Sequence, residues 1–245
     1  MAGMYDPKRL LHFPALLNAR DLGGYPTTDG SRTRWRSLVR SDDLSQLTPD
    51  GLEALSSFGI ETVVDLRWPD EVAATPSPVL SPALKHIRYE AFSLCTPTQD
   101  EWRARRADAS AKVLWNRSMV EHLRAEIRQV LEIIATASSG PLLFHCVAGK
   151  DRTGVIAALL LALADVMPEA IAYDYAASFE NLRDAYLQRY ADADEEALIE
   201  ALQCPEEGIH NMLAYLEGLG GAQAYLEAIG MQREHITRLR ARLRE

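Results

Sequence analysis

Apolar residues recur along much of the chain at the three- and four-residue spacing of an amphipathic helix. In one such stretch, 48–59, Thr48-Pro49 is typical of a helix start and Gly59 of a helix end. The apolar run VIAALLLALA lacks polar positions and is typical of a buried helix. That run lies within a predicted helix over 153–166, and two other helical regions are predicted, 112–137 and most of the chain beyond Pro168.

Short stretches between these helices are rich in β-branched and aromatic residues, which is typical of strands. Their alternation with helices predicts an α/β fold, in which a central, mostly parallel sheet is flanked by helices and followed by a helical C-terminal region. No repeat or linker interrupts the pattern, so we expect one domain over 1–245. The predicted strands are 32–41, 60–67, 85–92 and 141–146.

Composition narrows the class of protein without naming a function. The 245 residues are 47% apolar and 25% charged, as in ordinary globular proteins. A net charge of −9 disfavours nucleic-acid binding, although a local cationic pocket can still hold an anionic substrate.

Cysteine usage and hydropathy bear on where the protein works. The three cysteines form no C-x-x-C pair and no disulfide framework, which favours the reducing cytoplasm. No signal peptide is evident, although secretion without one stays open. The longest apolar run, at 155–164, is half of the ~20 residues that a membrane span needs, so no integral span is expected.

The candidate chemistry lies in FHCVAGKDRTG, residues 144–154, where an apolar strand, a short loop and a helix follow one another. Backbone N–H groups of such a loop join those of the helix N-terminus, and together they can cradle a tetrahedral oxyanion. Arg152 adds a planar fork for two oxygens, and the same positive field favours the thiolate form of Cys146. We expect Thr153 to donate a hydrogen bond to that sulfur, and His145 to orient the loop through backbone contacts.

A thiolate beneath a bound phosphate can attack phosphorus and form a cysteinyl-phosphate, which water then hydrolyses. Arg152 and the loop amides would meet the charge on the equatorial oxygens. This scheme requires neither a metal nor another cofactor. Val147, Ala148 and Gly149 would bind the phosphate together with Thr153, and Lys150 would face a second anionic group of the substrate.

The segment HCVAGKDRTG, 145–154, resembles the H-C-x5-R-[ST] signature of cysteine-dependent phosphatases. Its detailed form is similar to a bacterial branch of atypical tyrosine phosphatases that also act on phosphoinositides. The resemblance implies a tyrosine-phosphatase-like fold and a phosphorylated protein or phosphoinositide as substrate. In some relatives extra helices form a lid, and 180–210 is the candidate for one here. Other matching stretches are NARDLGG (18–24), RSD (40–42), DLR (65–67) with Glu71, and the C-terminal AYLEAIGM…ITRLRARL.

Hydrolysis also needs a group that protonates the leaving oxygen, and three aspartates are candidates. Asp151 lies inside the loop, where repulsion by the bound phosphate favours its protonated form, and in the similar bacterial branch the loop aspartate is the proposed acid. Asp108 is the second candidate. Asp70 is the third: it completes a Trp-Pro-Asp sequence, but lies about twice as far upstream of Cys146 as the acid loop of larger tyrosine phosphatases.

Two other interpretations of the loop stay open: a catalytically dead module that only recognises phosphate, and a sulfurtransferase-like enzyme with a loop cysteine. A nucleotide-binding G-x4-G-K-[ST] loop is excluded, because Phe144 and Asp151 occupy two of its required positions. Structural roles are expected for several other residues. They are Arg32, Arg34, Arg36 and Arg40 on a solvated strand face, Asp65 and Arg67 as an ion pair that braces the loop, and Cys95 and Cys204.

Overall fold

A five-stranded sheet in the order β1-β2-β5-β3-β4 forms the centre of the computed structural model, which describes residues 6–81, 84, 86–94 and 109–244. Every neighbouring pair is parallel except β1 and β2. The carboxyl ends of β2, β5 and β3 therefore meet at one edge of the sheet. The strands are β1 (Arg20–Asp21), β2 (Leu38–Ser41), β3 (Thr62–Asp65), β4 (Arg88–Ala91) and β5 (Leu142–His145).

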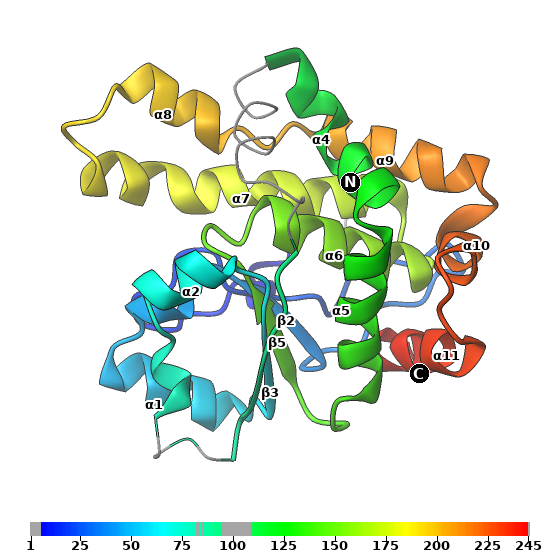
Figure 1. The fold of residues 1–245 in the computed structure, drawn as a ribbon, viewed down its shortest axis with the longest axis horizontal. Helices are drawn as coiled ribbons and strands as arrows, with labels where there is room; N and C mark the ends of the chain where they lie inside the picture. Colours follow the sequence, from blue (N-terminus) through cyan, green and yellow to red (C-terminus); the bar gives the residue numbers. More distant parts are fainter. Residues whose placement is uncertain (1–5, 82–83, 85, 95–108, 245) are drawn as a thin grey trace.

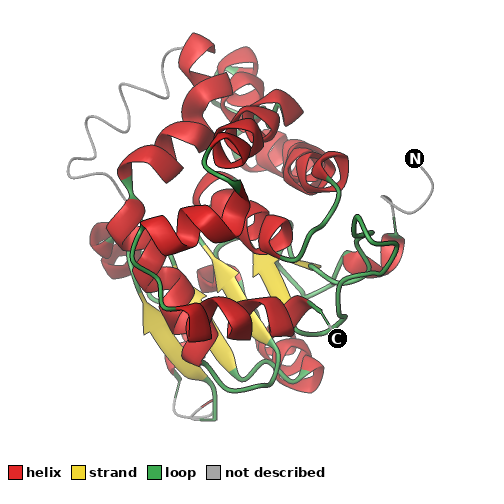
Figure 2. Cartoon of the chain, turned by 90° about the vertical axis from the view of Figure 1, so that its right-hand side faces the viewer, coloured by secondary structure: helices red, strands yellow, loops and turns green. Residues whose placement is uncertain are grey.

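Helices cover both faces of this sheet, and more helices gather at one end of it (Figures 1 and 2). In the N-terminal half they are α1 (Pro49–Phe58) and α2 (Pro69–Ala74), with short 3-10 turns at Pro7–Arg9, Leu44–Gln46 and Pro78–Leu80. The remaining helices are α4 (Ala109–His122), α5 (Arg124–Thr136), α6 (Asp151–Leu163), α7 (Pro168–Arg189), α8 (Glu195–Leu202), α9 (Glu206–Gly218), α10 (Gly221–Ala228) and α11 (Arg233–Leu243).

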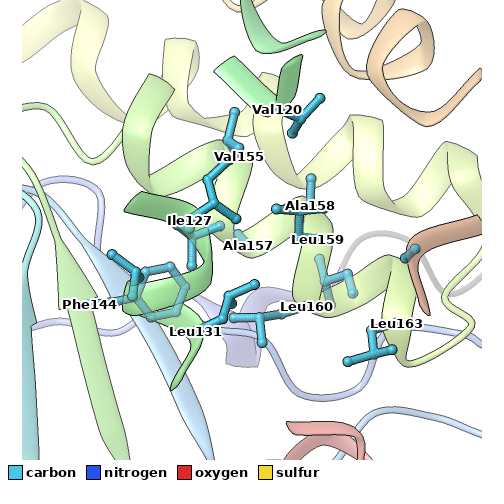
Figure 3. Packing of buried hydrophobic residues seen from close by; sticks show 14 of the residues in the cluster. Val120, Ile127, Leu131, Phe144, Val155, Ala157, Ala158, Leu159, Leu160 and Leu163 are labelled. Atoms are coloured by element: carbon cyan, nitrogen blue, oxygen red, sulfur yellow. The ribbon is translucent and has the colours of Figure 1, made fainter. Parts of the chain in front are cut away.

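Successive strand residues face opposite layers of the core, as the pleat requires. On one face, Val63 and Leu143 belong to the same apolar cluster as Leu55 of α1. On the other, Phe144 lies beside Ile127 and Leu131 of α5, with α6 behind them (Figure 3). Both faces of the central strands β2, β3 and β5 are thus buried, which explains their consecutive apolar residues, whereas β4 at the edge is partly exposed.

The predicted fold class is confirmed, and the helix at 49–58 has the predicted ends. The Thr48 side chain accepts a hydrogen bond from the N–H of Gly51, and Gly59 ends the helix with a positive φ of 90°. The strands at 60–67, 85–92 and 141–146 are present but shorter than predicted. The expected strand at 32–41 begins only at Leu38, because the preceding residues form a turn.

The prediction of one continuous helix over 112–137 was wrong. The chain leaves helical geometry at Leu123, where φ is −105° and ψ is 38°, and continues as α5. The two halves pack on different partners, since α4 lies along α9 whereas α5 contacts α11 and β3. A straight helix could not reach both, and helical periodicity alone carries no information about such a change of direction.

The C-terminal region is helical, as predicted, and α7 and α8 extend across one end of the sheet (Figure 1). The helix after the loop begins at Asp151, inside the HCVAGKDRTG segment, rather than at 153. None of the helices in the described parts of the chain is long and apolar enough to cross a membrane.

Candidate active site

The loop 146–150 joins the carboxyl end of β5 to the N-terminus of α6 at the centre of the sheet. Gly149 adopts a positive φ of 63°, which disfavours other residues. A Cβ added to Gly149 would lie 2.3 Å from the carbonyl oxygen of Ser41, at the end of neighbouring β2. The loop therefore approaches β2 more closely than any side chain at 149 would allow.

The backbone carbonyl oxygens of this loop are tied to the surrounding protein. Their partners come from the segment before β1, from β2 and the residues that follow it, and from the end of β5. The hydrogen bonds are Asn18 Nδ2 to Ala148 O (2.9 Å) and Gly149 O (3.2 Å), Arg40 Nη2 to Gly149 O (2.6 Å) and Lys150 O (3.2 Å), the Asp43 N–H to Val147 O (2.9 Å), and His145 Nδ1 to Cys146 O (3.2 Å).

This arrangement sets the direction of the loop amides. A trans peptide is planar, so its N–H points away from its C=O. The described peptide bonds are all trans. Because the carbonyls of 146–150 face the protein, the N–H groups of 147–151 face the opposite side. The loop can therefore hold an anion by its backbone, as the sequence predicts.

A cavity of about 410 Å³ opens over the loop, and Cys146 lines it with only 3% of its surface exposed. The cavity wall is aromatic and apolar on the side of α7 and α8. Its lining residues are Trp68, Glu71, Cys146, Val147, Ala148, Lys150, Asp151, Arg152, Tyr186, Tyr190, Leu198, Ala201 and Leu202. Gly149 and Thr153, which were predicted to bind substrate, are not among them.

Arg152 is buried at the start of α6 and is oriented by the segment after β3. Its guanidinium donates to both Glu71 carboxylate oxygens, at 2.6 and 3.0 Å, and lies 5.0 Å from the centre of the Trp68 ring. Burial alone would lower the pKa of Arg152, but electrostatic interaction with Cys146 and the hydrogen bonds to Glu71 outweigh it and raise the value. The arginine thus remains charged within the cavity wall.

The three candidate acids differ in position. Asp151 lines the cavity, and its Oδ1 accepts a hydrogen bond of 3.0 Å from the Tyr175 hydroxyl. Asp70 is exposed in the first turn of α2 and does not line the cavity, whereas its neighbour Glu71 does. Asp108 lies outside the described residues. Of the candidates that the structure describes, only Asp151 lies beside Cys146.

Lys150 reaches the end of α8. Its Nζ donates to the carbonyl oxygens of Ala201, at 2.7 Å, and Gln203, at 3.2 Å, and lies 3.6 Å from Asp151 Oδ1. The ammonium group therefore faces the C-terminal end of a helix, where cations are favoured. These two bonds occupy two of its three N–H donors.

The predicted support by His145 and the Asp65–Arg67 pair is confirmed. Arg67 Nη2 lies 2.7 Å from Asp65 Oδ2, and that oxygen lies 3.6 Å from His145 Nε2. Complete burial lowers the pKa of His145, so its ring is neutral at pH 7. The predicted bond from Thr153 to Cys146 is not formed, because the buried Thr153 Oγ1 has no hydrogen-bond partner among the described atoms.

Sequence reasoning missed the residues that hold the loop from behind. Arg40 was expected on a solvated face, but it is fully buried; Arg32, Arg34 and Arg36 are exposed as predicted. Asn18 and Asp174 were given no role. The burial of Arg40 could have been predicted from its position, because it follows the apolar residues of a strand and precedes Ser41-Asp42. An arginine in such a strand needs a buried partner.

A thiol and an arginine at an anion-binding loop between a parallel strand and a helix define a cysteine-dependent phosphatase. The family model described as "Tyrosine phosphatase family" matches residues 11–245. The chain therefore belongs to the tyrosine phosphatase family.

Individual relatives are bacterial. A tyrosine-protein phosphatase of Nostoc commune is 34% identical over 227 residues, which cover 84% of this chain and 74% of that protein. The triple specificity protein phosphatase PtpB of Mycobacterium tuberculosis is 29% identical over 196 residues, 69% of each chain. Among solved structures, the crystal structure of P. aeruginosa TpbA matches with 22% sequence identity and a TM-score of 0.31. The match covers 68% of this chain and 86% of that one.

Proposed function

We propose that the chain hydrolyses phosphate monoesters with Cys146 as nucleophile and Arg152 as the clamp on the transferred phosphoryl group. The observation that supports this most strongly is the position of Cys146 in a cavity over a loop whose carbonyls are all tied away from it. Sγ attacks phosphorus, an S–P bond forms, and the P–O bond to the leaving group breaks. Water then attacks phosphorus, which releases phosphate and restores the thiolate.

Asp151 is the proposed acid of this reaction. It donates a proton to the leaving oxygen in the first step and removes one from the attacking water in the second. Support comes from its place in the cavity wall and from the Tyr175 hydroxyl, which binds Oδ1 and leaves Oδ2 for the transferred proton. The loop amides, with Arg152, would bind the three equatorial oxygens.

Substitution of the two described cysteines tests this mechanism. Cys146→Ser should lower kcat on p-nitrophenyl phosphate by ~10⁴-fold or more, yet still bind vanadate. Cys204→Ser is the matched control: Cys204 Sγ is buried and donates to Leu202 O, a bond that a serine hydroxyl can keep. Activity should survive excess chelator. Turnover by Cys146→Ser near the wild-type rate, or complete loss with chelator, would contradict the mechanism.

Phosphotyrosine in proteins is the proposed principal substrate, and phosphoinositides are a second class. The aromatic wall of the cavity suits a phosphorylated ring. The second class is supported by Lys150, which could meet another phosphate after leaving Ala201 and Gln203. Lys150→Ala should lower kcat/KM for phosphoinositides more than for phosphotyrosine peptides. Equal losses on both would refute a second-anion role.

The end of α7 and all of α8, within 180–210, are proposed to form a lid. Tyr186, Leu198 and Leu202 from this region line the cavity that contains Cys146. Leu198→Ala should therefore speed alkylation of Cys146 by a bulky maleimide more than by iodoacetamide. This ratio is independent of the thiolate content, and an unchanged ratio would argue against a lid.

The proposed location is the cytoplasm. Cys146 and Cys204 are both unpaired, as in a reducing compartment. Fractionation of the source cells tests this, and recovery of the protein outside the cytoplasm would refute it.

A further inference from the structure

Arg40 lies behind the phosphate-binding loop and is one of the most deeply buried residues of the protein. It belongs to β2, which pairs in parallel with β5, and its side chain is 0% exposed. Nη2 donates to the carbonyl oxygens of Gly149 and Lys150, at 2.6 and 3.2 Å. Burial of a guanidinium is costly, so its retention here calls for a reason.

Asp174 of α7 holds the other side of this guanidinium. Its Oδ2 lies 2.5 Å from Arg40 Nη1, and its Oδ1 accepts bonds of 2.9 Å from Arg20 Nε and the Tyr25 hydroxyl. Burial alone would raise the pKa of Asp174, but Arg20 and Arg40 outweigh it and hold the value well below its ordinary range. Two guanidiniums share one carboxylate, so this group of three carries one positive charge directly behind the loop.

The two carbonyls that Arg40 binds determine where two amides point. Because each peptide is planar, the N–H groups of Lys150 and Asp151 face the cavity while the carbonyls of Gly149 and Lys150 face the protein. Lys150 O also accepts a bond of 2.7 Å from the Gly154 N–H within α6, whereas the other donor to Gly149 O, Asn18 Nδ2, lies at 3.2 Å, so Arg40 is the closest partner of Gly149 O. Without Arg40, the Gly149 carbonyl keeps only the longer bond from Asn18, and a rotated peptide would turn its oxygen toward the phosphate and repel it. Gly149, with its positive φ and no side chain, offers little resistance to such a rotation.

We propose that Arg40 is a positioning residue of the phosphatase reaction, which orients the amide of Lys150 toward the transferred phosphoryl group. This inference rests on the proposed function, because it assumes that the loop binds that group. Arg40 does not touch the substrate. It acts on transition-state binding through the loop, so its loss should lower kcat more than it raises KM.

Arg40→Met tests the proposal with the least damage to the core. Methionine is similar in length, and Asp174 keeps a buried partner in Arg20, so no charge is left unpaired. Loss of one preorganised donor typically costs ~10²–10³-fold in kcat, and a comparable loss is expected here. Inhibition by vanadate should weaken in parallel, and alkylation of Cys146 by iodoacetate at pH 6.5 should slow.

Arg242→Met is the matched control. Arg242 is also a buried arginine that donates to loop carbonyls, those of Ala137, Ser138 and Gly140, in the turn at the opposite end of β5. Its replacement should lower the melting temperature but leave kcat, vanadate inhibition and alkylation unchanged. The two variants thus separate a general loss of stability from a loss of loop geometry.

Arg40→Lys provides a second test, because lysine keeps the positive charge beside Asp174 but lacks the planar guanidinium group. It should recover part of the activity, and it carries the test if Arg40→Met does not fold. Folded Arg40→Met, or Arg40→Lys in its place, with kcat and vanadate inhibition within twofold of wild type would overturn the proposal. Equal losses in Arg242→Met would also overturn it. Failure of the proposed function looks different, since the wild type itself would then show no Cys146-dependent turnover.

Discussion

Replacement of Gly149 by alanine should damage catalysis far more than stability. Two effects add at this position. A non-glycine residue at a φ of 63° is strained by ~1–2 kcal/mol, and the new Cβ would lie 2.3 Å from Ser41 O and 2.7 Å from Asp42 N. These are backbone atoms next to β2 and cannot swing aside as a side chain would. The loop must therefore move by about 1 Å to restore ordinary contact.

A displacement of that size moves the amides of Gly149 and Lys150 away from the phosphoryl oxygens. Misplacement by about 1 Å can cost ~10²-fold in rate, so kcat/KM should fall by about that factor. Steady-state kinetics on p-nitrophenyl phosphate measures the loss, and thermal unfolding measures the accompanying change in stability. The melting temperature should fall by only several degrees.

Gly59→Ala is the control for backbone strain alone. Gly59 has a φ of 90° at the end of α1, and an added Cβ would meet no atom within 4 Å. This variant should lose a similar amount of strain-related stability with no change in kcat/KM. Folded Gly149→Ala with activity within a few-fold of wild type would refute the reasoning, as would an equal loss of activity in Gly59→Ala.

Three further predictions concern the acid, oxidation and pH. Asp151→Asn should lower kcat for an aryl phosphate with a poor leaving group more than for one with a good leaving group, by up to ~10²–10⁴-fold. Asp70→Asn should show no such difference between the two substrates. A difference in Asp70→Asn and none in Asp151→Asn would assign the acid to Asp70. Mild peroxide should inactivate the enzyme by oxidising Cys146, and bound phosphate should protect it. Burial raises the pKa of Cys204 to about 12, so this thiol should resist oxidation, and the Cys204→Ser variant should lose activity in peroxide at the wild-type rate. Burial alone would raise the pKa of Asp65, but His145, Arg67 and Tyr89 outweigh it and lower it to about 2. Asp65 therefore stabilises the fold at pH values above its ordinary range, and this stabilisation is lost as the pH falls through the lowered pKa, so urea unfolding should show a shallower acid dependence in Asp65→Asn.

Sequence alone predicted the parts of the protein whose signals are local. The helix at 49–58 carries its own start and stop residues, and the loop 144–154 carries its chemistry in consecutive positions. The strand–helix alternation fixed the fold class, because a parallel sheet requires helical crossovers. These features need no knowledge of distant contacts.

The missed features depend on partners that lie far apart in the chain. Arg40 looks like one more surface arginine until β2 is placed beside β5 and Asp174 is brought behind both. Lys150 looks free until the end of α8 is brought to its ammonium group. The break at Leu123 likewise follows from packing on two different helices. Spacing along the chain cannot specify such pairings.

The covalent intermediate on Cys146 is the centre of this account, and trapping it is the most direct test. Wild-type protein would be mixed with an excess of aryl phosphate, quenched in acid during turnover, digested and analysed by peptide mass spectrometry. The account predicts a phosphoryl group on Cys146 in the wild type and none at this position in Cys146→Ser. Turnover without any adduct on Cys146, or with the phosphoryl group on another residue, would contradict it.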